Sequence, residues 1–89
     1  MARNRDQLLR DICNNPRNVR LAEACKAAEK LGFSAKGQKG SHQAYSKTGE
    51  VALLNFQKQK DGKIPTYQAK QLIAMIEHYW DFEKGEPKK

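Results

Sequence analysis

A basic, glycine-punctuated stretch, K-G-Q-K-G-S-H at residues 36–42, ends in a histidine. Imidazole titrates closest to neutral pH of the ordinary side chains, which suits it to proton transfer. The two glycines of the stretch let the backbone approach a phosphate closely, and Lys36 and Lys39 neutralise its charge. Beside a bound ribose phosphate, His42 would remove the 2′-hydroxyl proton, so that this oxygen attacks the neighbouring phosphorus while lysines stabilise the developing charge. A site of this kind would cleave RNA without a metal.

The same stretch also has a plainer interpretation. A hairpin-like turn can carry a half-exposed histidine that does no chemistry, and no acid partner for His42 is visible in the sequence. The residue types alone leave both interpretations open. If the stretch binds RNA, His42 is the candidate catalytic residue, and the candidate RNA-binding residues are Lys36, Lys39, Gly40, Ser41, Lys47 and Lys58.

The charge balance favours a polyanionic partner. Seventeen Lys and Arg residues stand against ten Asp and Glu, which gives a formal charge of +7. Residues 34–63 hold six lysines and two acidic residues, so this third of the chain contributes +4 of that total. Nucleic acid is the leading candidate partner, and surplus surface lysine is the alternative.

The two cysteines and the hydropathy pattern argue against several other classes. Cys13 and Cys25 form no CxxC motif and have no histidine at zinc-ligand spacing, so we expect no metal site, no disulfide and no cofactor. No apolar run approaches the roughly 18 to 20 residues that cross a membrane, and no secretory leader is visible. We therefore expect a cytoplasmic protein that does not bind membranes.

Two helices are predicted to position the histidine. Asn18 is a plausible N-cap for a helix that runs to Leu31, because apolar residues recur along one face and Gly32 supplies a left-handed stop. The second helix opens at Pro65-Thr66 and runs to Trp80. Its apolar stripe consists of Ala69, Leu72, Ile73, Ile76, Tyr79 and Trp80.

Three short strands are predicted between these helices, over residues 33–36, 42–47 and 50–56. G-Q-K-G-S separates the first two, and the dipeptide T-G at 48–49 predicts a hairpin between the second and third. Residues 57–64 read as a polar, basic loop with a turn at Asp61-Gly62, or alternatively as a fraying edge strand.

These elements predict one small α+β domain at 18–81. Residues 1–17 are interpreted as an N-terminal arm with a possible short helix, and residues 82–89 as a flexible tail. Two helices can cover only one face of a three-stranded antiparallel sheet. The other face is therefore expected to stay open for a partner.

Several of these residues carry a resemblance to a known family. The run L-G-F-S-A-K-G-Q-K-G-S-H-Q-A-Y resembles the HicA toxins, which pair G-F at the end of the first helix with Q-K-G-S-H before the second strand. A Y-Q-x-x-Q pattern near the start of the last helix, at 67–71, is similar to one branch of that family. The likeness covers about residues 15–79. The matching residues of the first motif are Gly32, Phe33, Gln38, Lys39, Gly40, Ser41 and His42.

The resemblance implies a fold and a function. HicA-like proteins have a double-stranded-RNA-binding-like α-β-β-β-α fold and are toxins that cleave messenger RNA without a metal, using the histidine that corresponds to His42. A HicB-type antitoxin neutralises them. The chain departs from many members at Gln43, Ala44 and Tyr45. The alternative is a non-catalytic module that grips double-stranded RNA by shape with the same basic sheet face.

Overall fold

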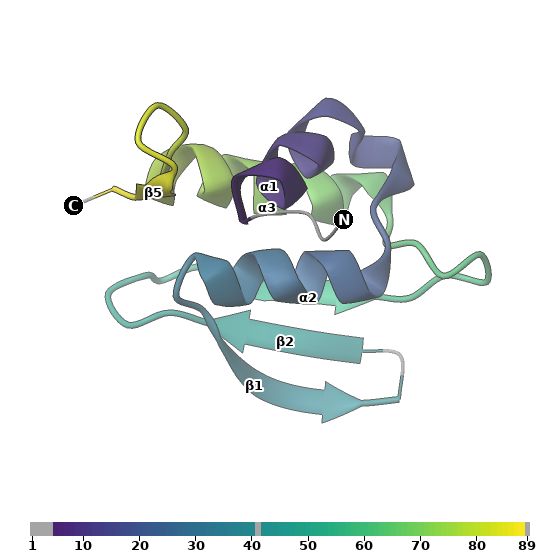
Figure 1. The fold of residues 1–89 in the computed structure, drawn as a ribbon. Helices are drawn as coiled ribbons and strands as arrows, with labels where there is room; N and C mark the ends of the chain where they lie inside the picture. The colour runs from purple at the N-terminus through teal and green to yellow at the C-terminus, as the bar shows by residue number, and fades with distance from the viewer. Residues whose placement is uncertain (1–4, 41, 89) are drawn as a thin grey trace.

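The computed structural model describes residues 5–40 and 42–88. These residues form an α+β domain, and Figure 1 shows the arrangement of its elements. None of its helices combines the length and apolar character needed to cross a membrane. In chain order the elements are α1 (Arg5–Asn14), the 3₁₀ turn η1 (Pro16–Asn18), α2 (Leu21–Lys30), β1 (Ser34–Lys39), β2 (His42–Ser46), β3 (Leu54–Gln57), α3 (Thr66–Tyr79), β4 (Trp80–Asp81) and β5 (Glu86–Pro87).

The predicted three-stranded antiparallel sheet is confirmed, with strand order β1-β2-β3. Successive side chains of a strand point to opposite faces of a sheet. Tyr45, Leu54 and Phe56 are no more than 2% exposed, whereas the alternate residues Asn55 and Gln57 are exposed. One face of the sheet is therefore buried against helices and the other is not.

Helices α2 and α3 both pack against β3 and cover the buried face. Three alanines of α2, at positions 24, 27 and 28, are fully buried, and their small side chains allow close packing. From α3, Leu72 and Ile76 enter the core one helical turn apart. The apolar stripe predicted for the last helix is thus the face that the structure buries.

The N-terminal segment is not an arm beside the domain, as the sequence interpretation had it. It forms α1, which packs on α2 and α3 on the side away from β1 and β2 (Figure 1). Leu8, Leu9 and Ile12 are at most 4% exposed, because their three- and four-residue spacing places them on one side of the helix. The indole Nε1 of Trp80 donates to Asp6 Oδ1 at 3.0 Å, which ties the start of α1 to the end of α3.

The stop signal predicted at Gly32 is confirmed. Gly32 has φ +95°, its N–H donates to Glu29 O, and the N–H of Phe33 donates to Ala28 O, so a Schellman motif closes α2. The predicted N-cap is wrong by two residues. Asn18 ends the 3₁₀ turn, and Arg20 caps α2 while its backbone N–H donates to Glu23 Oε1 at 3.0 Å.

The predicted strand bounds also need correction. The first strand extends to Lys39, and the third begins at Leu54 instead of Glu50 because the Glu50 side chain is engaged elsewhere. Its carboxylate accepts hydrogen bonds from the Tyr79 hydroxyl at 2.7 Å and the Ala52 N–H at 3.2 Å. Residues 47–53 therefore form a loop longer than the predicted two-residue turn.

The C-terminal segment is folded against the end of α3 and does not behave as the predicted free tail. β4 and β5 pair in an antiparallel manner, with Trp80 opposite Pro87 and Asp81 opposite Glu86. Gly85 allows the intervening turn at φ +65°, and the N–H of Lys88 donates to Tyr79 O at 2.7 Å. Backbone hydrogen bonds thus hold this segment against the end of α3, although few of its side chains are apolar.

Candidate functional site

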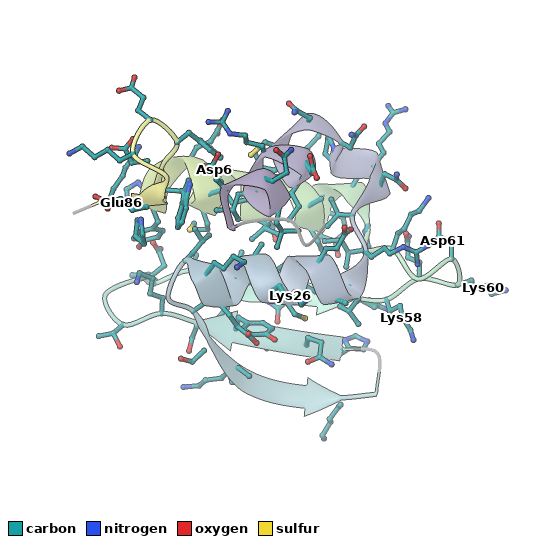
Figure 2. All side chains as sticks on the ribbon, in the orientation of Figure 1. Asp6, Lys26, Lys58, Lys60, Asp61 and Glu86 are labelled. Carbon is teal, nitrogen blue, oxygen red and sulfur yellow. The ribbon has the colours of Figure 1, made fainter. Side chains whose placement is uncertain are left out.

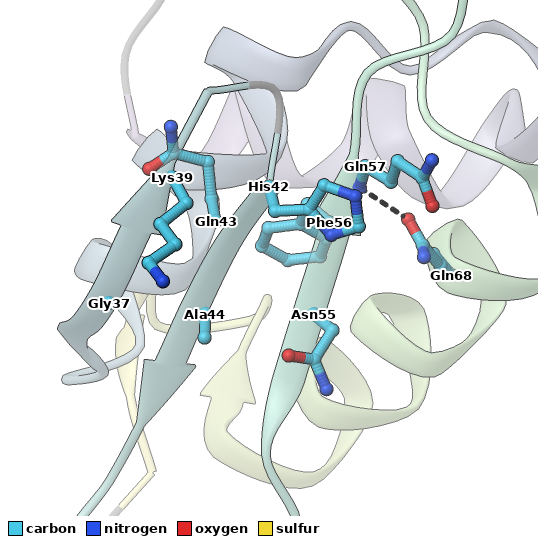
Figure 3. Close-up of a pocket in the computed structure, with 9 residues that line it drawn as sticks. All are labelled: Gly37, Lys39, His42, Gln43, Ala44, Asn55, Phe56, Gln57 and Gln68. Atoms are coloured by element: carbon cyan, nitrogen blue, oxygen red, sulfur yellow. Dashed lines mark hydrogen bonds between the residues drawn. The ribbon is translucent and has the colours of Figure 1, made fainter.

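The uncovered face of the sheet, called the open face below, carries two rows of side chains across the three strands. Register places Lys39 opposite His42 and His42 opposite Gln57, which together form the reaction row. The adjacent row, called the floor row, consists of Gly37, Ala44 and Asn55. Figure 3 shows both rows from the open side.

The floor row creates a hollow beside the histidine. Gly37 has no side chain and Ala44 has only a methyl group, so little fills the space above the middle of the sheet. The hollow has a volume of about 450 Å³, within the range of small-ligand sites. It is lined by Gly37, Lys39, His42, Gln43, Ala44, Asn55, Phe56, Gln57 and Gln68.

One wall of the hollow is fixed by a buried amide. Gln68, in the first turn of α3, is only 5% exposed. Its Oε1 accepts the backbone N–H of Gln57 at 2.8 Å, and its Nε2 donates to the Tyr67 hydroxyl at 3.2 Å (Figure 3 shows the first bond). Gln68 therefore holds the end of β3 against α3 and sets the position of Gln57 in the reaction row.

Replacing Gln68 with alanine is expected to lower the free energy of unfolding by about 1 to 3 kcal/mol, because the Gln57 N–H loses its acceptor. The matched control is Gln71→Ala, three residues along the same helix. Gln71 is exposed, so its loss is expected to change stability by less than about 0.5 kcal/mol. Urea unfolding followed by circular dichroism measures both values. Equal effects of the two substitutions would show that the buried amide does not hold the strand.

The structure brings only some of the sequence-predicted RNA-binding residues to His42. Lys39 lines the hollow, and Figure 3 shows its side chain extending along β1 toward Gly37. Lys58 directly follows Gln57, the strand partner of His42, but it does not line the hollow; Figure 2 shows it with Lys60 on the loop at that end of the sheet.

Two predicted lysines lie elsewhere. Lys36 falls at a β-bulge, where the register shifts between Ala35 and Gly37, so it leaves the ladder and does not line the hollow. Lys47 follows the far end of β2, where its ammonium lies 5.1 Å from the centre of the Tyr79 ring. Lys47 thus packs on an aromatic ring and is not part of the reaction row.

Of the glycine and serine that precede His42, the structure describes only the glycine. Gly40, with φ +56°, follows Lys39 in the link from β1 to β2, and a left-handed residue at this point suits a tight hairpin. Ser41 lies outside the described residues.

The sequence interpretation missed Asn55 and Gln57. The alternation L-N-F-Q at 54–57 has a period of two, which assigns both amides to the face opposite Leu54 and Phe56.

The ionisable groups behind the sheet differ from those on the open face. The Tyr45 hydroxyl lies on the helix side, within 3.4 Å of Glu29 Oε2, and burial raises the pKa of this phenol well above its usual range. Burial also raises the pKa of the neighbouring Cys25 thiol. A raised pKa lowers the share of Cys25 in the thiolate form, which is the reactive form. Across residues 5–40 and 42–88, no group of three or more His, Cys, Asp or Glu side chains could hold a metal ion.

Comparison of the chain with protein-family models, with curated proteins and with solved structures finds no match.

Proposed function

We propose that this chain is an endoribonuclease toxin of the HicA type, with a double-stranded-RNA-binding-like fold, that cleaves messenger RNA in the cytoplasm. The observation that carries the proposal is the reaction row, in which one exposed imidazole stands between a lysine and an amide on an uncovered sheet face. The formal charge of +7 supports a polyanionic substrate.

The reaction row suits cleavage by the neighbouring hydroxyl of the RNA itself. His42 accepts the 2′-hydroxyl proton, the 2′-oxygen forms a bond to phosphorus, and the P–O5′ bond breaks. The departing 5′-oxygen takes a proton from water. Lys39 and Lys58 stabilise the charge that develops on the phosphoryl oxygens. The products are a 2′,3′-cyclic phosphate and a 5′-hydroxyl end.

The open face also suits the expected protein partner. Two helices cover the opposite face, so a HicB-type antitoxin that blocks access to His42 has to bind over the hollow. A small reading frame that adjoins this one and encodes a HicB-like protein is the expected genomic context.

The proposal is tested by incubating the purified protein with a long single-stranded transcript in the presence of EDTA. Continued cleavage supports an imidazole-based mechanism, and cleavage that depends on added magnesium contradicts it. Retention of duplex RNA by a protein that leaves the transcript intact would instead identify a non-catalytic double-stranded-RNA-binding module.

A further inference from the structure

Tyr67 is an exposed aromatic residue that the cleavage chemistry does not use. The chain has seven Phe, Tyr and Trp residues, all within the described ranges, and Tyr67 is the only exposed one, at 63%. Burying the ring would stabilise the fold, because an aromatic side chain has a large apolar surface. Single exposed apolar residues are nevertheless common on proteins. Tyr67 differs from such residues in how its hydroxyl is held.

A buried amide holds the Tyr67 hydroxyl. Gln68, which is 5% exposed and lines the hollow, donates from Nε2 to this hydroxyl at 3.2 Å. The Oε1 of the same amide accepts the backbone N–H of Gln57 at 2.8 Å (Figure 3). One buried side chain therefore contacts both the exposed tyrosine and the end of β3 that contributes Gln57 to the reaction row. A ring that is already held loses less conformational freedom when a ligand packs on it.

The surroundings of the ring suit a strand of RNA. Tyr67 does not line the hollow itself, but its hydroxyl contacts Gln68 in the wall, so Tyr67 lies at the rim on the α3 side. The exposed Lys58 directly follows Gln57, so the end of β3 that Gln68 holds also carries a cation for the RNA backbone. Proteins that bind single-stranded RNA combine such cations with aromatic rings on which bases stack.

We propose that Tyr67 is a stacking platform for an unpaired base of the RNA, one that flanks the nucleotide whose ribose faces His42. This inference rests on the proposed function for its substrate class. The platform accepts any of the four bases, because stacking uses the face of the base and not its hydrogen-bonding edge. It requires a single-stranded segment, because the bases of a duplex already stack on one another.

The test separates base stacking from phosphate binding. Two fluorescein-labelled pentamers of equal charge are compared, pentauridine and the same ribose-phosphate backbone without bases. Each is titrated at low salt with His42→Ala protein, and the dissociation constants are obtained by fluorescence anisotropy. Adding Tyr67→Ala is expected to weaken the binding of pentauridine roughly 5- to 150-fold, the usual effect of losing one aromatic platform. It is expected to leave the affinity for the base-free pentamer unchanged.

Two further variants and one control sharpen the result. Tyr67→Phe keeps the ring and loses only the hydroxyl, so it is expected to retain most of the affinity for pentauridine. Tyr67→Leu keeps an apolar side chain without a π-face and is expected to behave like Tyr67→Ala. The matched control is Val51→Ala, which removes apolar surface from a residue that is 98% exposed in the loop before β3. It is expected to change neither dissociation constant, and circular dichroism checks that every variant is folded.

The outcomes separate the platform from the catalytic proposal. Equal effects of Tyr67→Ala on the two pentamers, or no effect on either, overturn the platform, whether or not the wild-type protein cleaves RNA. A loss with Tyr67→Phe as large as with Tyr67→Ala also overturns it, because the hydroxyl would then be the contact. A preference for pentauridine that depends on the Tyr67 ring, in a protein whose wild-type form leaves transcripts intact, supports the platform and contradicts the endoribonuclease.

Discussion

Replacing His42 with alanine is expected to slow RNA cleavage by about 10²- to 10⁴-fold, the usual contribution of a general base. This corresponds to roughly 3 to 5 kcal/mol of transition-state stabilisation. His42 is exposed at the start of β2 on the open face. Its removal is therefore expected to change folding stability by no more than about 0.5 kcal/mol. The measurement is the initial rate of cleavage of a labelled transcript by each protein.

The second histidine provides the matched control. His78 is exposed on α3, and its ring contacts the Tyr79 ring edge to face, with 4.6 Å between centres. It lies ten residues beyond Gln68, about 15 Å along the helix from the wall of the hollow. His78→Ala is expected to retain wild-type activity. If the two substitutions slow cleavage equally, imidazole chemistry at the reaction row is not the mechanism.

Replacing Leu9 with alanine is expected to lower the free energy of unfolding by about 2 to 5 kcal/mol, because the side chain is 0% exposed and its loss leaves a cavity. The free energy of unfolding of a small domain is only about 5 to 15 kcal/mol, so this loss is a large share of it. The expectation follows from the packing of α1 against α2 and α3.

The control for this substitution is Leu53→Ala, the same change at a side chain that is 49% exposed in the loop before β3. Its effect is expected to stay below about 0.5 kcal/mol. Urea unfolding monitored by far-ultraviolet circular dichroism compares the two variants. If Leu9→Ala is as mild as Leu53→Ala, α1 is an appended arm, as the sequence suggested, and not part of the core.

Local signals predicted most of the secondary structure, and tertiary contacts account for the errors. The helix stop at Gly32 and the apolar stripe that includes Leu72 and Ile76 are each specified by residues close together in sequence. The end of α2 and the buried face of α3 can therefore be predicted from residue types and their spacing. The docking of α1 includes a hydrogen bond between Asp6 and Trp80, which are 74 residues apart in sequence. A contact between residues so far apart cannot be predicted from a local sequence pattern.

The candidate site was predicted only in part, because some of its residues come together through contacts between different strands. The composition of the turn identified His42 and Lys39, which the register indeed places opposite each other. Lys47 looked equivalent from its position in the sequence. It lies five residues along the strand from His42, about 16 Å at the rise of an extended chain. Asn55 comes from a different strand, so its place beside the hollow depends on the pairing of β2 with β3.

The exposed apolar run at the start of the predicted third strand was misleading. V-A-L-L at 51–54 has strand-like composition, but only Leu54 is buried, and Val51 is 98% exposed. The side chain of Glu50 bonds to Tyr79 and to the N–H of Ala52, and the Tyr79 hydroxyl holds the pKa of this carboxyl below its usual range. Hydrogen bonds to the Glu50 side chain thus take the place of strand pairing at the start of this run.

The most direct test of the central claim, that an imidazole on the open face activates the ribose hydroxyl, is the chemistry of the cleaved ends. Wild-type protein is incubated with a transcript and with a copy that carries 2′-deoxy nucleotides at the mapped cleavage positions. The mechanism predicts 5′-hydroxyl and 2′,3′-cyclic phosphate ends and no cleavage at the 2′-deoxy positions. Products with 5′-phosphate and 3′-hydroxyl ends, or cleavage at a 2′-deoxy position, would contradict it.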